Sequence, residues 1–152
     1  MSIAHRTGNP LRAEVVDQIR RFSAGVVLFN QKVAERVGLH PTDVQCLNLL
    51  ELVGTCTPGK MTEGMGLTTG GVTVMLDRLE KAGYIKREPN PDDRRSVLVR
   101  VSEKKMEQID IHYAEVAKQF EAHIALMPDA DLKVVIDFLK QVNAIRVNAV
   151  SG

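Results

Sequence analysis

The stretches Thr68–Leu79 (TTGGVTVMLDRL) and Ile85–Val101 (IKREPNPDDRRSVLVRV) decide the fold of this chain. In the first, apolar residues recur every three or four positions, which predicts a helix with one buried face. In the second, two alternating apolar segments flank a tip rich in turn residues, which predicts a β-hairpin. The sequence therefore predicts a short helix that leads almost directly into a hairpin.

Shorter helices are predicted before this pair of elements. Pro41 or Thr42 starts one of them, with Thr42 and Gln45 as a capping box. Thr57 caps the next, which Pro58 begins. Three short helices before a two-stranded hairpin predict a winged helix-turn-helix core within a mainly α fold.

Long amphipathic helices are predicted at both ends of the chain. Apolar residues follow helical spacing from Pro10 to Gly38, again after Ser102, which suits an N-cap, and once more after Pro128. A core this small cannot cover apolar stripes of that length, so we expect a homodimer in which two copies pair them. The alternative is a monomer whose terminal helices pack on their own core.

Composition narrows the class of function. The chain is 44% hydrophobic but only 4% aromatic, which argues against a large aromatic-lined cofactor pocket. It contains no nucleophile with a base, no paired carboxylates and no glycine-rich phosphate loop, so we expect neither an enzyme nor a cofactor. Its four histidines lack the spacing of metal ligands on one helix face.

Location is inferred from what the sequence lacks. No apolar run reaches the roughly 18 residues that a membrane span needs. The N-terminal segment MSIAHRTGNP has no apolar core of a secretory signal. Two cysteines, Cys46 and Cys56, do not make a disulfide framework. We therefore expect a reduced, cytoplasmic setting without membrane contact.

Positive charge is concentrated in one stretch. The net charge of the chain is +1, yet residues 78–105 hold nine basic and five acidic residues, which leaves +4 there and −3 elsewhere. A local basic stretch is the electrostatic pattern of a nucleic-acid partner. The alternative is a random excess on a solvated surface.

The outer face of the predicted helix carries small side chains in its first turn. Gly70 and Gly71 permit close approach of another backbone, although a first turn also tolerates glycine at little cost. In a DNA major groove, Val74 could touch a thymine methyl group and Thr73 could bond a base edge or a phosphate. Alternatively, Val74 packs under a neighbouring loop. Asp77 would repel phosphate, so it is better suited to orienting Arg78 or an arginine of the hairpin, which is the wing of this fold. The alternative is that Asp77 is an exposed charge without a partner.

The hairpin carries the cations that suit DNA. Arg94 and Arg95 at its tip can enter a minor groove, and Asp92 or Asp93 beside them can hold an arginine in a fixed rotamer. Basic residues of the first strand can reach flanking phosphates. The alternatives are a salt-bridged surface hairpin and a winged helix that binds a protein. The predicted contacts to double-stranded DNA are Thr68, Thr69, Gly70, Gly71, Thr73, Val74, Arg78, Lys86, Arg87, Arg94 and Arg95.

The predicted helix and hairpin resemble those of a known protein family. Leu76–Ile85 (LDRLEKAGYI), Pro91–Arg95 (PDDRR) and Val97–Ser102 resemble MarR-type winged-helix transcription regulators. The resemblance implies a homodimer that binds a roughly palindromic operator, usually as a repressor, and that a small ligand or an oxidant releases. The chain departs from the family pattern in Pro58–Gly66, in the start Thr68–Gly71, and at Val74, where Arg or Lys is common. Base preference is therefore not implied.

The resemblance also implies a domain plan. We expect a flexible arm at 1–9 and a single MarR-like domain at 10–152. Within it, dimerisation helices occupy 10–38 and 103–150, and the DNA-binding core occupies 41–102.

An effector pocket is implied between the dimer helices and that core. Its candidate residues, each of which is also a candidate for ordinary core, are Phe22, Phe29, His40, Tyr113 and Phe120. Cys46 lies on an apolar helix face, and Cys56 is predicted in a loop with no basic residue nearer than Lys60. We therefore expect no redox role for either thiol.

Overall fold

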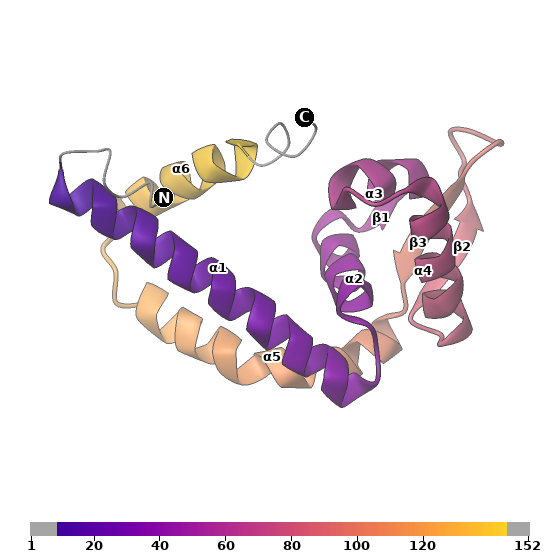
Figure 1. Cartoon of the computed structure of the whole chain (residues 1–152), viewed down its shortest axis with the longest axis horizontal. Coiled ribbons are helices and arrows are strands. Elements are labelled where there is room, and N and C mark those ends of the chain that lie inside the picture. The colour runs from indigo at the N-terminus through magenta and orange to yellow at the C-terminus, as the bar shows by residue number, and fades with distance from the viewer. Residues whose placement is uncertain (1–8, 146–152) are drawn as a thin grey trace. The chain divides into compact units, whose positions relative to one another are not determined.

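The computed structural model describes residues 9–145, apart from the side chain of Ile145. This range holds α1 (Pro10–Val37), α2 (Pro41–Val53), β1 (Thr55–Cys56), α3 (Pro58–Met65), α4 (Thr69–Lys81), β2 (Ile85–Pro89), β3 (Val97–Val101), α5 (Glu103–Ile124) and α6 (Asp129–Ile145) (Figure 1). The predicted order of helices and hairpin is confirmed. The chain divides into two compact units, one up to Gln45 and one from Cys46.

α1 is bounded by local capping interactions. The Asn9 side chain accepts a hydrogen bond from the backbone N–H of Leu11 at 2.9 Å and a longer one from that of Arg12. At the other end, Gly38 adopts the left-handed conformation, with φ of 70°, that commonly ends a helix. Asn9 is thus the N-cap of α1, and residues 1–8 of the predicted arm lie outside the described residues.

The capping box predicted at Thr42 and Gln45 is wrong. α2 begins at Pro41, and His40 stands at the cap: its Nδ1 accepts from the backbone N–H of Thr42 at 3.3 Å. In return, the carboxylate of Asp43 accepts from the backbone N–H of His40 at 3.3 Å. Asp43 is fully buried, and a buried carboxylate requires such donors. His40 and Asp43 thus form a reciprocal pair of hydrogen bonds like that of a capping box. The pair lies two positions before the predicted one, and an imidazole replaces the hydroxyl.

A third strand joins the predicted hairpin. β2 and β3 pair antiparallel from Ile85 opposite Val101 to Pro89 opposite Val97. The two-residue β1 pairs with the other edge of β3, with Cys56 opposite Val99, so the sheet order is β1-β3-β2. The prediction of a loop at Cys56 is wrong, because two residues are too few to show the alternation that marks a strand.

The core of the second unit fixes one face of α4. Buried apolar side chains come from α2 to α5 and from the sheet, among them Leu47, Leu50, Met61, Val72, Met75, Leu76, Leu79, Ile85, Val99, Met106 and Ile109. The four that α4 supplies, Val72, Met75, Leu76 and Leu79, are the residues whose three- and four-residue spacing predicted one buried face. Burial of each such side chain contributes about 1.5–3 kcal/mol. α4 is therefore held by its apolar face, and its opposite face is left to solvent.

The terminal helices keep exposed apolar side chains. These are Leu11, Val15, Phe22, Val26, Val27 and Leu28 on α1, Ile111, Phe120 and Ile124 on α5, and Val134, Val135, Ile136, Phe138 and Leu139 on α6. Large exposed apolar surfaces mark interaction sites in soluble proteins. Residues 146–150 of the predicted dimerisation segment lie outside the described residues, and the division into arm, dimerisation helices and core stays a prediction.

Candidate nucleic-acid interface

α4 begins with a side-chain cap that explains one of its two glycines. Thr68 Oγ1 accepts a hydrogen bond from the backbone N–H of Gly71 at 3.1 Å, so Thr68 is the N-cap of α4. A Cβ on Gly71 would lie 3.2 Å from that same oxygen, which is tighter than ordinary van der Waals contact. At Gly70, by contrast, a Cβ would meet nothing within 4 Å. Gly71 thus serves the cap, and only Gly70 leaves open space on the outer face.

The outer face of α4 is solvent-exposed as predicted. Val74 is 62% exposed, which excludes the alternative that it packs under a neighbouring loop. Thr69, Thr73 and Arg78 are exposed as well. An apolar side chain held in water on a helix that is firmly packed on its other side is suited to contact with a partner surface.

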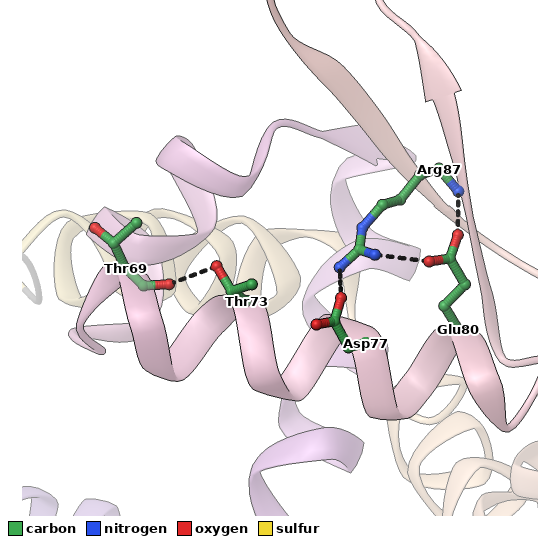
Figure 2. Close-up of polar contacts among 5 residues, drawn as sticks. All are labelled: Thr69, Thr73, Asp77, Glu80 and Arg87. Carbon is green, nitrogen blue, oxygen red and sulfur yellow. Dashed lines mark hydrogen bonds and ion pairs between the residues drawn. The ribbon is translucent and has the colours of Figure 1, made fainter.

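Thr73 uses its hydroxyl within the helix. Its Oγ1 donates to the backbone carbonyl of Thr69 at 2.9 Å, as Figure 2 shows. This i to i−4 bond is common for threonine in helices, and it fixes the rotamer of the side chain. The oxygen therefore presents lone pairs rather than a proton to the outside.

Asp77 orients an arginine of the wing. Arg87, on β2, places Nη2 2.7 Å from Asp77 Oδ1 and Nη1 2.6 Å from Glu80 Oε2 (Figure 2). The Arg87 side chain is 25% exposed, against 60% for Asp77. Asp77 thus pairs with a wing arginine, which is one of the roles predicted for it. The sequence missed Glu80 as a member of this group, and Arg87 is bound by two carboxylates where phosphate contact was predicted.

Side chains of the wing tip accept hydrogen bonds from its own backbone and so fix the shape of the turn. Asn90 Oδ1 accepts from the N–H of Asp92 at 3.1 Å, and Asp93 Oδ1 accepts from the N–H of Arg95 at 3.0 Å. Asn90 also donates to Ser96 Oγ across the tip at 2.8 Å. Asp93 therefore shapes the turn through the main chain rather than holding a guanidinium group as predicted.

The cations of the wing face solvent. Within residues 9–145, neither Arg94 nor Arg95 forms an ion pair, and both side chains are exposed. Lys86, on the first strand, is exposed too, whereas Arg100 lies 3.8 Å from the carboxylate of Glu88. The structure thus brings the outer face of α4 and an arginine-tipped hairpin together in the second unit, with Arg87 between them.

The predicted effector residues lie in different surroundings. Phe22 is exposed and Phe29 half-buried on α1, and His40 caps α2. On α5, Phe120 is exposed and Tyr113 is half-buried, with its hydroxyl accepting from Asn48 at 3.2 Å. Burial raises the pKa of Tyr113. A pocket made of these five residues stays a prediction.

An open hollow in the second unit contains none of them. It has a volume of about 380 Å³ and is lined by Leu50, Glu51, Gly54, Thr55, Arg100, Val101 and Glu103. Burial raises the pKa of Glu51, and the nearby carboxylate of Asp110 raises it further. No sequence signal marked this group, because its members come from α2, the sheet and α5.

The thiols offer little reactivity. Cys46 is buried, and Cys56 is half-buried on β1. Burial raises the pKa of the Cys56 thiol, while the charge of Lys60 lowers it in part. Among residues 9–145, no cluster of three or more His, Cys, Asp or Glu side chains is arranged to hold a metal ion. No helix in that range is both long and apolar enough to span a membrane.

Comparison with known proteins agrees with this geometry. Residues 39–97 match the model of the MarR family. The chain is 43% identical over 89 residues to YcgE of Bacillus subtilis (strain 168), an uncharacterized HTH-type transcriptional regulator, and the match covers 59% of this chain and 58% of YcgE. The chain therefore spans less than two thirds of that relative.

Solved structures share the fold. The transcriptional regulator Tm0710 from Thermotoga maritima has a TM-score of 0.63 at 23% identity, covering 87% of this chain and 93% of that one. A mutant MarR from E. coli complexed with operator DNA has a TM-score of 0.55 at 19% identity, covering 85% and 93%.

Fold and surface together define a winged helix-turn-helix protein, in which α4 is the exposed helix and the β2–β3 hairpin is the wing. Over residues 39–97 the chain is similar to the MarR family, and over 89 residues it is similar to the regulator YcgE.

Proposed function

We propose that this protein is a transcription regulator that binds double-stranded DNA, with α4 in the major groove and the wing on the adjacent backbone or minor groove. One observation carries the proposal: the outer face of α4, with Val74 62% exposed, is followed by a hairpin whose tip arginines form no ion pair within the described residues. The operator complex of the related E. coli protein supports the same class of partner.

A salt titration tests DNA binding. We expect the logarithm of the association constant to fall linearly with the logarithm of salt concentration, with a slope of about −0.9 for each phosphate neutralised. The probe is a duplex recovered by this protein from a random-sequence library. A shallow dependence would favour the competing function, a winged helix that binds another protein, and failure to recover any duplex would refute the proposal.

The active form in this proposal is a homodimer on a roughly palindromic operator. Exposed apolar side chains on α1, α5 and α6 supply surface that a second copy would bury. Two copies of α4 should then contact half-sites about 10–10.5 base pairs apart. Light scattering during size exclusion gives the subunit number, and footprinting gives the spacing. A single-subunit mass together with one unpaired footprint would contradict the dimer.

Regulation is proposed to be repression in the cytoplasm, relieved by a small ligand rather than by oxidation. The buried Cys46 and the raised pKa of Cys56 keep the thiolate population low. Peroxide should therefore leave DNA binding unchanged in a gel-shift assay. A library of small molecules screened for release of DNA tests the ligand, and Phe22→Ala and Tyr113→Ala test the predicted pocket.

A further inference from the structure

We propose that Arg87 positions the wing against α4 and is not a contact to phosphate, an inference that rests on the proposed DNA-binding function. Arg87 lies on β2, and its two terminal nitrogens contact two different carboxylates of α4. The sequence alone assigns Arg87 to DNA because it stands among cations. The observed contacts give it an intramolecular role.

Three contacts fix Arg87 to α4. The guanidinium group bonds Asp77 at 2.7 Å and Glu80 at 2.6 Å, and the Glu80 carboxylate also accepts the backbone N–H of Arg87 at 3.3 Å. β2 is an edge strand, so this carboxylate satisfies a backbone donor that β3 does not reach. Glu80 therefore holds both the backbone and the side chain of one residue of the wing.

The spacing of the two carboxylates determines the angle of β2 relative to α4 as well as the distance between them. Asp77 and Glu80 are three positions apart, which places them on the same side of α4, about one turn from each other. Two attachment points along one helix resist rotation of the strand about either of them (Figure 2). The planar fork of an arginine can bridge two such points, whereas the single ammonium group of a lysine cannot do so with the same geometry.

The charges make a phosphate contact unfavourable. One guanidinium group lies between two carboxylates, so the cluster has a net charge of −1. A phosphate would compete with both carboxylates for the same N–H groups while being repelled by the surplus negative charge. The tip residues Arg94 and Arg95, which form no ion pair within the described residues, are better suited to phosphate contact.

The consequence for DNA binding is geometric. α4 carries the residues suited to bases, among them Val74, and the wing carries Arg94 and Arg95 for the backbone or minor groove. Both can engage one duplex only if the angle between helix and wing is correct. The Arg87 contacts set that angle before DNA arrives, so their loss should reduce binding to the selected sequence more than binding to unrelated DNA.

The test compares Arg87→Lys and Arg87→Ala with Lys86→Ala, a matched control at the neighbouring exposed cation. Binding is measured across salt concentrations with the library-selected duplex and with an unrelated duplex of equal length. We expect both Arg87 variants to weaken binding to the selected duplex by about tenfold, equivalent to about 1.4 kcal/mol, with the salt slope unchanged. Lys86→Ala should reduce the slope by about 0.9 per subunit. Wild-type affinity in Arg87→Lys, or a reduced slope in Arg87→Ala, would overturn the proposal.

Asp77→Asn provides a second measurement that does not depend on the folding of an Arg87 variant, because it keeps the shape of the side chain. The positioning role predicts a lower ratio of selected to unrelated binding, with unrelated DNA bound at least as tightly once a negative charge is gone. An equal rise in affinity for both duplexes would contradict it. If the wild type binds neither duplex, the proposed function itself fails; if it binds and Arg87→Lys matches it, only the positioning role fails.

Discussion

The hydroxyl of Thr73 donates a hydrogen bond to the backbone carbonyl of Thr69, 2.9 Å away and one turn earlier on α4. A hydroxyl has one proton, so Thr73 Oγ1 can only accept a further bond in this state. Phosphate oxygens are acceptors too, whereas the amino groups of adenine and cytosine in the major groove are donors. Of the two partners predicted for Thr73, a base edge is the one compatible with this bond.

Replacing Thr73 with Val should therefore reduce discrimination between bases. The variant keeps the branched shape and loses the acceptor, and we expect the selected duplex to lose about 1 kcal/mol relative to a duplex changed at one base pair. Competition binding over a set of single base-pair changes measures this. Thr73→Ser, which keeps the hydroxyl, is the control. An equal loss of affinity for every duplex in the set would indicate phosphate contact instead.

Val74→Arg should change the preferred DNA sequence and leave the fold intact. Val74 is 62% exposed, so a longer side chain has room and the change in unfolding free energy should stay within about 0.5 kcal/mol. Selection from a random library, repeated with the variant, would reveal the new preference. An unchanged selected sequence would show that residue 74 does not read bases.

Gly70→Ala should affect stability and DNA binding in opposite directions. A Cβ at Gly70 meets nothing within 4 Å in the free protein, and alanine gains up to about 1 kcal/mol of helix propensity, less near a helix end. If DNA approaches the backbone closely here, the same methyl group should weaken binding by about tenfold, or about 1.4 kcal/mol. Gly59→Ala on α3, where a Cβ also meets nothing within 4 Å, is the matched control. Equal DNA affinity of wild type and Gly70→Ala would exclude close approach at this position.

Arg94→Ala and Arg95→Ala should each reduce the salt slope of DNA binding by about 0.9 per subunit. Neither residue forms an ion pair within the described part of the chain, so thermal unfolding should be nearly unchanged. Lys118→Ala, on the exposed surface of α5, serves as the control for a general loss of charge. A slope that falls as much in the control would show that the wing is not a specific contact.

Glu51→Gln should stabilise the protein at neutral pH. The pKa of Glu51 is raised in the fold, first by burial and then by Asp110, so the folded state favours the protonated carboxyl more than the unfolded state does. The stability that protonated Glu51 contributes is present below its ordinary pKa of 4.5 and is lost as pH rises through the raised value. The Tm of Glu51→Gln should exceed that of the wild type at pH 7, and the difference should vanish in acid. A constant difference at all pH values would exclude titration of Glu51 as the cause.

The elements of the DNA-facing unit follow from local sequence. The periodic residues from Val72 to Leu79 are those buried on α4, Thr68 caps the helix, and Gly83, with φ of 77°, follows its end. Each of these signals acts between residues four or fewer positions apart, where the helix geometry itself fixes the distance. The two strands of the hairpin were predictable because alternating apolar residues lie on both sides of a short segment rich in turn residues.

Tertiary structure alone decided the contacts between elements. Arg87 meets Asp77 ten positions away, and β1 exists only because β3 offers it an edge. Sequence spacing determines which side chains share a face, but it does not determine which faces meet. That choice is made when the helices and sheet bury their apolar surfaces together, and the ion pairs form where the packing leaves opposite charges in reach.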